Sequence, residues 1–512
     1  MAFFKYDYYN ECMRLKNAYN DRKNEVLIMK NEQKSPHLAV DIGASSGRLI
    51  SGQLQNGKIH LEEIYRFENE LIQKNSHLCW DIDRIKEHVI TGIKKAHDDG
   101  LEPTTIGIDT WGCDFVLLDT EGNRIGDSVS YRDSRTDGIR DFLESEGILS
   151  FRDLYAKTGI QYLQFNTIYQ LVALKNEHPE QLERAETFLM IPDYLNYILC
   201  GVLANEYTNA TTTALVNAET HQWDDDLIQR LGLPRKIFKP LSMPGKVLGH
   251  FTDGIKKQTG TDMAVILPAT HDTGSAFLSV PARDERSVFL SSGTWSLMGV
   301  ENRKAITSVE SEQANFTNEG GYDYRYRYLK NIMGLWMIQS VRREISKKSG
   351  VKPSFPELIE KAKERQDIKT FVSTDDRRFL ASEDMREAVR QACQEKGEPI
   401  PDETGAVMAV IYNSLSRDYQ KTVKTLEKIT GKIFTAVNIV GGGSQDMYLS
   451  QKTADACGLP VLAGPTEGTA LGNLIVQMLY EKEFPDLQTA RDTVRESFDI
   501  KTVLPKNKGF TF

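Results

Sequence analysis

The sequence predicts an α/β protein made of two halves, each of which opens with a pair of strands joined by a glycine-bearing turn. Its 512 residues are enough for two large domains, since a single domain usually holds roughly 100 to 200 residues. The first strand, turn and strand unit begins at His37, and a second unit of the same type spans residues 287–300. This order of elements favours two α/β domains with a boundary near residues 275–286.

Composition and charge exclude several classes of function. Apolar residues make up 40% and charged residues 26% of the chain, as in an average globular protein. Lys plus Arg number 63 and Asp plus Glu number 72, which leaves a net charge of −9. The chain has no basic stripe for a nucleic-acid backbone and no apolar stretch near the roughly 18 residues that span a bilayer. We therefore expect no nucleic-acid or membrane partner.

The cysteines are scattered along the chain without a CxxC pair or a close Cys/His cluster. This spacing indicates neither a disulfide framework nor a zinc site. It is typical of a reducing compartment, so a cytoplasmic location is expected. A separate expectation concerns the oligomeric state, for which a monomer is favoured. The six positions are Cys12, Cys79, Cys113, Cys200, Cys393 and Cys457.

Residues 1–36 precede the first predicted strand and form an amino-terminal extension. They are rich in Lys, Asn, Glu and Tyr, lack the apolar segment of a secretory signal, and end in Ser35-Pro36. This composition predicts a poorly ordered segment. Two interpretations stay open: translation that starts at Met29, or a genuine helical extension.

The first half is predicted to begin with a three-stranded meander. HLAVDIG (37–43), RLISGQL (48–54) and KIHLEEIYRF (58–67) are separated by short turns. Two more strands are predicted in TIGIDTWG and CDFVLLD, with a hairpin turn at residues 120–123. Apolar residues then recur at spacings of three and four between about residues 134 and 235, which predicts a helical region.

The second half repeats the opening hairpin with SVFLSSGTWSLMGV (287–300). Farther along, the β-branched strand AVNIV (436–440) runs through three glycines into a predicted helix. PVLAGP (460–465) is the last predicted strand, and a helix is expected from about Ala470 to Lys482.

Two turns of small and hydroxylated residues predict a phosphate site. DIGASSGR (41–48) places Asp41 at a strand end and then exposes backbone N–H groups and the hydroxyls of Ser45 and Ser46. Asp41 then stands where a phosphate-bound Mg²⁺ would be held, usually through water. Alone, this octet also fits an ordinary hairpin. SSGTWS (291–296) offers the same donors in the other half, so the pair favours a nucleoside triphosphate held between two lobes.

The triple glycine Gly441-Gly442-Gly443 follows a strand and precedes a helix. Glycines allow a flat ligand such as adenine or ribose to approach the backbone closely; a flexible loop without a ligand is the alternative. The chain has no GxGxxG, no GxxxxGK[ST] and no HRD/DFG set, which argues against P-loop and protein-kinase sites.

Three short polar motifs are candidates for the reacting substrate. His271-Asp272-Thr273 follows an apolar strand, so Asp272 is either a general base for a hydroxyl or a helix N-cap. DTWGCD (109–114) holds two carboxylates and a Trp, a mixture that suits polyol recognition but also ordinary core packing. YRDSRT (131–136) is polar and unusually charged for a strand end, and a solvated surface ion cluster is its ordinary interpretation.

Taken together and in this order, these motifs resemble those of the FGGY carbohydrate kinases, which share the actin and Hsp70 type of ATP-binding fold. The resemblance rests on strings such as DIGASSGR, DTWGCDFVLLD, GIQYLQFNTIYQL, HDTGSA, LSSGTWSLMG and IVGGGSQ, and it runs from about residue 37 to about residue 480. It implies two actin-like (ribonuclease H-like) ATPase domains with a cleft between them. Residues 37–280 would bind sugar and phosphate, residues 281–485 would bind ATP, and residues 486–512 would pack as a tail on the second domain.

The resemblance also implies roles for individual residues. Asp272 would be the catalytic base. Sugar contacts would come from Gly112, His271, Asp272, Thr273 and Asn331. The ATP site would be lined by Ala44, Ser45, Ser46, Gly47, Arg48, Thr294, Gln339, Gly441, Gly442 and Gly443. Asp41 would serve Mg²⁺. No disulfide is implied, because Thr453 stands four residues before Cys457 where some relatives pair two cysteines.

The implied reaction is ATP-dependent phosphorylation of the terminal 1-hydroxyl of L-rhamnulose. Kinases of another ketose, such as L-fuculose or a xylulose, are the nearest alternative. A nucleotide-gated binding protein or chaperone on the same fold is the alternative from another class. It predicts ATP turnover without a sugar acceptor.

Overall fold

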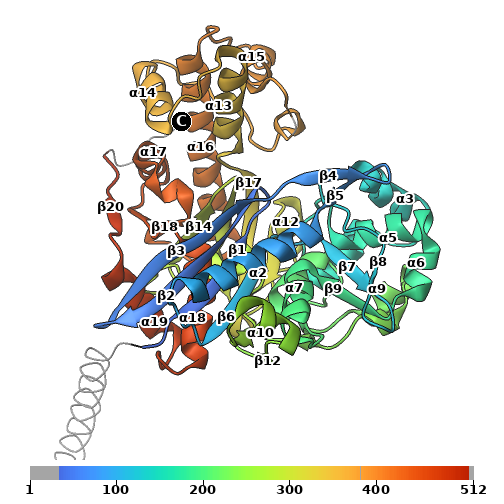
Figure 1. The fold of residues 1–512 in the computed structure, drawn as a ribbon. Helices are drawn as coiled ribbons and strands as arrows, with labels where there is room; N and C mark the ends of the chain where they lie inside the picture. The colour runs from blue at the N-terminus through green and yellow to red at the C-terminus, as the bar shows by residue number, and fades with distance from the viewer. Residues whose placement is uncertain (1–33, 381, 507–512) are drawn as a thin grey trace, which may run out of the picture.

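The computed structural model describes residues 34–380 and 382–506, which form two lobes, each built around a β-sheet (Figure 1). The sheet of the first lobe has six strands in the order β12-β13-β6-β1-β2-β3. β1 pairs with β2 antiparallel and with β6 parallel, so it lies in the middle of the sheet. The strands are β1 (His37–Ile42), β2 (Ser46–Gln55), β3 (Lys58–Glu68), β6 (Thr105–Thr110), β12 (Val247–His250) and β13 (Ala264–Ile266).

Both faces of this sheet are covered by helices. Leu38 and Val40 of β1 pack into a cluster with α2 (Ile82–Asp98) and α7 (Ile191–Cys200), whereas Ala39 packs on the opposite face. A buried strand alternates its side chains between the two faces. This arrangement explains why Leu38, Ala39 and Val40 form a continuous apolar run without alternation, since every residue of β1 is buried.

A mixed region follows β6 and forms the right-hand side of the first lobe in Figure 1. Its three-stranded sheet has the order β8-β7-β9, and short helices enclose a separate apolar core. The strands of this region and its neighbouring ribbons are β4 (Leu71–Lys74), β5 (His77–Trp80), β7 (Phe115–Leu118), β8 (Arg124–Ile125), β9 (Thr187–Met190), β10 (Asn205–Glu206) and β11 (Leu241–Ser242). The helices are η1 (Ser134–Thr136), α3 (Ile139–Ser145), α4 (Phe151–Thr158), α5 (Thr167–Glu177), α6 (Pro179–Arg184), α8 (Tyr207–Ala210), η2 (Thr211–Thr213), α9 (Asp225–Arg230), η3 (Arg235–Ile237) and α10 (Asp253–Thr259).

The second lobe is built on a seven-stranded sheet of order β16-β17-β15-β14-β18-β19-β20. Its centre repeats the first lobe, because β14 pairs antiparallel with the next strand β15 and parallel with the distant β18. The strands are β14 (Ser287–Ser292), β15 (Trp295–Asn302), β16 (Thr317–Gly320), β17 (Tyr326–Met333), β18 (Ala436–Val440), β19 (Val461–Ala463) and β20 (Lys501–Val503).

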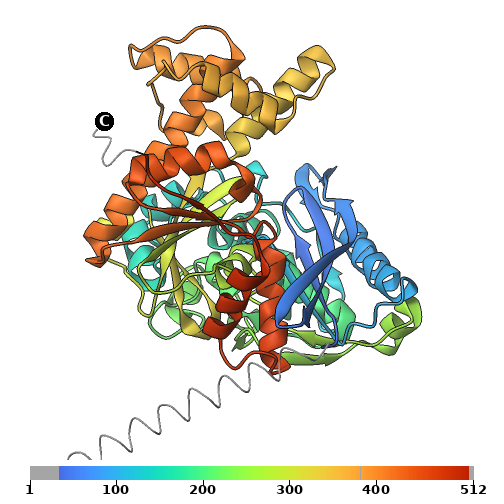
Figure 2. The ribbon, with the colours of Figure 1, turned by 90° about the vertical axis from the view of Figure 1, so that its left-hand side faces the viewer.

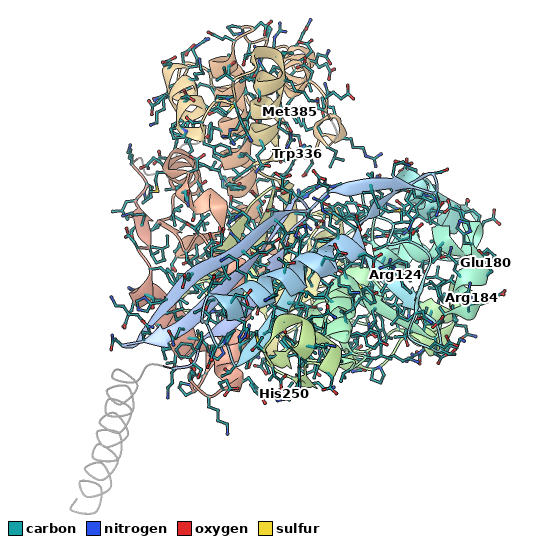
Figure 3. All side chains as sticks on the ribbon, in the orientation of Figure 1. Arg124, Glu180, Arg184, His250, Trp336 and Met385 are labelled. Carbon is teal, nitrogen blue, oxygen red and sulfur yellow. The ribbon has the colours of Figure 1, made fainter. Side chains whose placement is uncertain are left out.

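A group of helices extends from the second sheet and forms the top of the molecule in Figure 1. The long helix α16 (Thr404–Thr430) links this cap to the sheet and ends at Gly431, whose φ of 68° an L side chain rarely adopts. Trp336 and Met385, labelled in Figure 3, begin two cap helices, and both join the apolar core of this lobe. The cap and nearby helices are α12 (Val309–Gln313), η4 (Tyr322–Tyr324), α13 (Trp336–Ser349), α14 (Phe355–Glu364), η5 (Arg377–Phe379), α15 (Met385–Glu395), η6 (Gly442–Gln445) and α17 (Met447–Cys457).

Two helices connect the lobes at the base of the cleft. α11 (Asp272–Leu278) leaves the first lobe, and α18 (Gly468–Tyr480) returns from the second lobe to pack on β1, β2 and β6. The two helices approach so closely that a Cβ on Gly472 would meet the carbonyl oxygen of Ser275 at 1.7 Å. Hydrogen bonds from the Asn473 amide to Gly107 and from the Gln477 amide to Leu38 fix α18 on the first sheet.

The carboxyl-terminal segment divides between the lobes, in contrast to the predicted tail on the second domain. α19 (Leu487–Ser497) packs against β3 of the first sheet, as Figure 2 shows for the red helices beside the blue strands. Only β20 joins the second sheet, by pairing antiparallel with β19. The physical reason is that α19 follows α18, which has already crossed to the first lobe, and Leu487, Ala490 and Val494 bury their side chains there.

The predicted hairpins, the meander and the strand at residues 461–463 are confirmed, and the helix expected at 470–482 begins and ends two residues earlier. The region 134–235 is mainly helical, but it also contains β9 and β10. Residues 1–33 of the predicted extension lie outside the described residues. Residues 34–36 are joined to the first sheet, because Lys34 donates to Leu54 and Thr104 donates to Pro36.

Two observations on the described residues concern membrane-spanning helices and disulfides, neither of which the sequence predicts. No helix in residues 34–380 and 382–506 is long and apolar enough to cross a membrane. Five of the six cysteines lie in this part of the chain, and all five are unpaired.

Candidate active site

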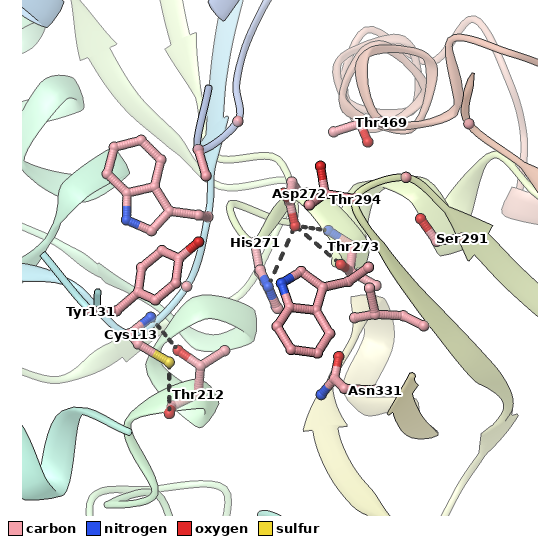
Figure 4. Close-up of a pocket in the computed structure, with 18 of the residues that line it drawn as sticks. Cys113, Tyr131, Thr212, His271, Asp272, Thr273, Ser291, Thr294, Asn331 and Thr469 are labelled. Carbon is pink, nitrogen blue, oxygen red and sulfur yellow. Dashed lines mark hydrogen bonds and ion pairs between the residues drawn. The ribbon is translucent and has the colours of Figure 1, made fainter. Parts of the chain in front are cut away.

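A cavity of about 400 Å³ lies between the lobes and is lined by residues of both. This volume is in the range of small-molecule sites. Figure 4 shows Tyr131, Cys113 and Thr212 on one side, Ser291, Thr294 and Asn331 on the other, and Asp272 between them. The cavity therefore contains side chains from motifs that lie far apart in the sequence.

One end of the cavity is formed by the two glycine-bearing turns. Gly43, Ala44 and Ser45 line it from the turn between β1 and β2, and Ser291 to Thr294 line it from the turn between β14 and β15. Thr466 and Thr469, at the start of α18, complete this end. Hydroxyl and backbone donors that converge from three elements suit an anionic ligand such as a chain of phosphates.

Asp41 lies at this end, paired with Arg48. Nε and Nη2 of Arg48 donate to Oδ2 of Asp41 at 3.1 and 2.9 Å. Arg48 also forms an ion pair with Glu467 of the second lobe at 2.5 Å, which links the lobes across the cleft. The two recorded side-chain hydrogen bonds of Asp41 both use Oδ2, and its Oδ1 has no recorded partner among the described residues.

Asp109 stands beside Asp41 in the register of β1 and β6 but does not line the cavity. Its side chain is fully buried and accepts a hydrogen bond of 2.6 Å from Asn473. Burial, followed by the negative charge of Asp41, raises the pKa of Asp109 well above its ordinary value. The interpretation of Asp109 as a polyol contact is therefore wrong: it holds α18 on the sheet.

Asp272 is the first residue of α11 and lies in the middle of the cavity. The strand before it is held by Thr110, whose N–H donates to Thr270, and by an isolated bridge between Thr110 and His271. The buried carboxylate of Glu206 accepts hydrogen bonds from both the N–H and the hydroxyl of Thr270. These contacts fix the position of Asp272 relative to the first sheet.

The carboxylate of Asp272 uses one oxygen within the protein. Its Oδ1 accepts from the N–H and the hydroxyl of Thr273 at 2.5 and 3.0 Å, and Nε2 of His271 lies 3.4 Å from the same oxygen. Oδ2 has no recorded partner among the described residues, and 32% of the side chain is exposed to the cleft. Burial raises the pKa of Asp272, so the carboxylate is a stronger base than in water.

His271 is oriented by two buried charged residues behind it. Nη2 of Arg327 lies 3.1 Å from Nδ1 of His271, and Arg327 forms an ion pair of 3.0 Å with Glu319. Oε2 of Glu319 lies 3.3 Å from the same Nδ1, so Arg327 and Glu319 together hold the ring with Nε2 toward Asp272. Burial alone would raise the pKa of Glu319, but the charge of Arg327 and the contact with His271 outweigh it, and its pKa lies below the ordinary value.

An aromatic wall borders the other end of the cavity. Trp111 and Tyr131 line it, and the ring of Phe165 packs on Tyr131 with centroids 5.0 Å apart. Asp114 holds this wall from behind: its buried carboxylate accepts from the indoles of Trp80 and Trp111 and from the N–H of Tyr131. The aromatic faces of this wall can pack against the C–H surface of a ligand. Asp114 does not line the cavity but holds the aromatic residues in position.

Most of the residues predicted from the sequence line this cavity, including Asp41, Arg48, Gly112, His271, Asp272, Thr273, Thr294, Asn331, Gly441 and Gly442, together with Ala44 to Ser46. Three predicted residues do not. A Cβ on Gly47 would lie 2.1 Å from the ring of Phe67, and one on Gly443 would lie 2.0 Å from the hydroxyl of Ser292. These two glycines allow close packing, and Gln339 lies on α13 outside the cavity lining.

Several lining residues were assigned no individual role from the sequence. They include Gln161, Phe165, Trp295, Thr317, Glu319 and Thr466. Gln161 and Phe165 lie in GIQYLQFN, which follows α4 as an irregular segment with no strand or helix pattern. Glu319 and Thr317 lie on β16, a short strand that reaches the cavity only because β17 pairs with it.

Comparison with known proteins gives a consistent result. The N-terminal domain of the FGGY family of carbohydrate kinases matches residues 37–279, and its C-terminal domain matches residues 288–480. A rhamnulokinase of Oceanobacillus iheyensis is 50% identical over 466 residues, which cover 91% of this chain and 97% of the relative. A rhamnulokinase of Bacillus subtilis is 41% identical and covers 92% of this chain and 96% of the relative.

Solved structures agree with this fold. A ligand-bound xylulose kinase from Lactobacillus acidophilus has a TM-score of 0.74 at 18% identity, and the match covers 92% of this chain and 94% of the other. Glycerol kinase from Plasmodium falciparum, solved with ADP, has a TM-score of 0.73 at 15% identity with the same coverage. At these identities the likeness establishes the two-domain α/β architecture.

Proposed function

The chain belongs to the FGGY family of carbohydrate kinases, and we propose that it transfers the γ-phosphoryl group of ATP to the 1-hydroxyl of L-rhamnulose. Three rhamnulokinases that are 41–50% identical to it each cover more than nine-tenths of the chain. The observation that carries the mechanism is that one cavity holds both glycine-bearing turns, an aromatic wall and Asp272, and that Asp272 lies between Tyr131 on one side and Ser291 and Thr294 on the other (Figure 4). The reaction then takes place where the two ligands meet.

In this mechanism Asp272 accepts the proton of the 1-hydroxyl through Oδ2. The hydroxyl oxygen forms a bond to the γ-phosphorus, the bond between that phosphorus and the β,γ-bridging oxygen breaks, and ADP leaves. His271 and Thr273 hold Oδ1 and so keep the carboxylate in place. Donors of the two turns face the phosphates and offset the charge that develops there.

Mg²⁺ fits this site as an ion held mainly by the nucleotide. The described residues contain no group of three or more His, Cys, Asp or Glu that could hold a metal alone. Asp41, with Oδ1 left over beside the phosphate-binding turns, is the residue that would reach the waters of the ion. When bound, Mg²⁺ supplies positive charge next to the phosphates.

Asp41→Ala is expected to raise the Mg²⁺ concentration needed for half-maximal rate by about 10- to 100-fold, because groups in the outer shell of a metal site contribute this much to affinity. The KM for the ketose should change little, since Asp41 lies at the phosphate end. Steady-state rates over a magnesium titration measure both effects. An unchanged magnesium dependence would remove Asp41 from this role.

Gly442→Ala is expected to raise the KM for ATP severalfold without changing the melting temperature. A Cβ at Gly442 meets no atom within 4 Å, so the protein itself tolerates it, whereas a nucleotide against this loop would not. Gly47→Ala is the contrasting variant, because its Cβ would overlap the ring of Phe67 and lower the melting temperature. If Gly442→Ala leaves the KM for ATP unchanged, the loop does not contact the nucleotide.

The raised pKa of Asp272 predicts a pH dependence on the acid side. The base acts only when ionised, so kcat/KM should fall as the pH drops through its pKa, and this fall should begin above the pH expected for an ordinary aspartate of pKa about 3.9. A pH profile of initial rates, with circular dichroism to show that the protein stays folded, measures this. Rates that stay flat down to about pH 4 would contradict an elevated pKa.

A panel of ketoses tests the choice of substrate. With L-rhamnulose, L-fuculose, D-xylulose and L-xylulose as acceptors, we expect the highest kcat/KM for L-rhamnulose in a coupled ADP assay. A site built to bond each hydroxyl rejects an epimer strongly, because buried polar groups are then left unpaired. A higher kcat/KM for any other member of the panel would reassign the substrate.

A further inference from the structure

Four side chains that line the cavity carry a buried polar atom without a hydrogen bond in the described structure, namely Gln161, Ser292, Thr317 and Glu319, and two of them lie together. Gln161 is 2% exposed, and neither Nε2 nor Oε1 of its amide has a hydrogen bond within the described structure. Thr317 is fully buried, and its hydroxyl is also unpartnered. Unpaired buried groups destabilise a protein, so their presence together in a ligand cavity indicates that a ligand completes their hydrogen bonds.

Gln161 and Thr317 come from different lobes, and the lobes contact each other next to both residues. Asn318 of β16 donates from its N–H and from its side chain to the carbonyl of Gly159, at 2.8 and 3.0 Å. Gln161 follows Gly159 by two residues, and Thr317 precedes Asn318. The contact therefore brings Gln161 and Thr317 to the same region of the cavity, which is bounded by both lobes.

Thr317 is placed beyond the catalytic carboxylate by the geometry of its strand. Residues two apart on a strand point to the same face, so Thr317 shares a face of β16 with Glu319. Glu319 lies 3.3 Å from Nδ1 of His271, whose opposite nitrogen faces Asp272. Thr317 thus belongs to the part of the cavity on the far side of His271 from Asp272.

Aliphatic side chains also line the cavity. Ile160 is the neighbour of Gln161 in the chain, and Leu297 lies opposite Asn331 in the pairing of β15 with β17. An amide and a hydroxyl in a cavity that also holds aliphatic side chains match the far end of a 6-deoxyketose. That end carries hydroxyl groups followed by a methyl group.

We propose that Gln161 and Thr317 form a distal subsite that binds the ketose hydroxyls farthest from the phosphorylated 1-hydroxyl, with Ile160 and Leu297 against the terminal methyl group. This inference rests on the proposed ketose kinase function. The amide of Gln161 both donates and accepts, so it can bind a hydroxyl in either sense. The pair determines specificity, because a ketose that lacks these hydroxyls or points them elsewhere leaves the buried groups unpaired.

The test uses Gln161→Leu and Thr317→Val, which keep the size of the side chains and remove their polar atoms. Each variant should lower kcat/KM for L-rhamnulose about 10-fold or more while the KM for ATP stays unchanged. The melting temperature of the ligand-free enzyme should be equal or higher, because an unpaired buried group has been removed. This combination of weaker sugar use and undiminished stability would not arise from a merely structural role.

Thr453→Val is the matched control. Thr453 is fully buried, but its hydroxyl donates to Leu449 within α17 at 2.8 Å and does not line the cavity. This variant should lower the melting temperature and leave ketose kinetics unchanged.

Two results would overturn the subsite. One is an unchanged kcat/KM for the ketose in both variants. The other is a parallel loss of melting temperature and of ATP and sugar kinetics, as expected for residues that only pack. If the wild-type enzyme prefers another ketose, the proposed substrate fails separately, and the same variants are then measured with the preferred acceptor.

Discussion

Asp272→Asn is expected to lower kcat by about 10²- to 10⁴-fold, the usual contribution of a positioned general base. Asparagine keeps the shape of the side chain and can still accept from Thr273 through its amide oxygen, so the start of α11 should stay folded. It cannot take a proton from the hydroxyl. Single-turnover rates with L-rhamnulose and ATP measure the loss at the chemical step.

The control for this variant is Asp284→Asn. Asp284 is an exposed aspartate whose recorded contacts are all with Arg286, so the same change there should leave kcat and the melting temperature as in the wild type. Binding of ATP to Asp272→Asn, followed by tryptophan fluorescence, should also be retained, because Trp111 and Trp295 line the cavity. Turnover of Asp272→Asn near the wild-type rate would show that another group accepts the proton.

Glu319→Gln is expected to lower the free energy of unfolding by about 3–5 kcal/mol, the usual cost of breaking a buried ion pair. Arg327 is 1% exposed and forms its recorded ion pair with Glu319. A neutral glutamine removes the only ion-pair partner recorded for this buried positive charge in the described structure. The same change should lower kcat/KM, because Arg327 then no longer holds His271 in a fixed orientation beside Asp272. Urea unfolding followed by circular dichroism measures the stability term.

Glu310→Gln is the matched control for Glu319→Gln. Glu310 pairs with Lys428, and the two side chains are 49% and 74% exposed, so the change should cost less than about 1 kcal/mol. Equal unfolding free energies for the two variants would mean that the ion pair of Glu319 and Arg327 contributes no more than a surface pair.

The sequence predicts the strands of the cleft well because their local signals agree with their packing. Residues 38–40 are apolar and belong to a strand in the centre of the first sheet that is buried on both faces. The glycine-bearing turns after Asp41 and Ser292 are short, so the strands that flank them could only pair as hairpins. Asp272 comes soon after the apolar run AVILPAT (264–270), and it lines the cavity.

Contacts with residues far away in the sequence determine the roles of Asp109 and Asp114, which the local pattern cannot distinguish. DTWGCD contains two carboxylates of similar appearance, yet Asp109 and Asp114 are both buried and neither lines the cavity. Their roles follow from Asn473, which is 364 residues away from Asp109, and from Trp80 and Gln170, which bond Asp114. Such long-range partners leave no mark on the motif itself.

The local sequence also does not show which glycines have space beside them for a side chain. Gly442 and Gly443 are neighbours in one motif, but only the first has open space where a side chain would stand. The position of Gly443 depends on Ser292, which belongs to the turn of a different hairpin. The crossing of α18 back to the first lobe, and with it α19, likewise depends on the fit between Gly472 and Ser275.

The measurement that tests the central claim most directly is ADP formation by the wild-type enzyme with and without L-rhamnulose, with the sugar product analysed by phosphorus and carbon NMR. A kinase whose base is Asp272 should form ADP in step with a phosphate ester at carbon 1 of the ketose, and only slowly when the ketose is absent. Equal ADP formation in both samples, with free phosphate in place of the ester, would contradict sugar phosphorylation and favour a nucleotide-gated protein on the same fold.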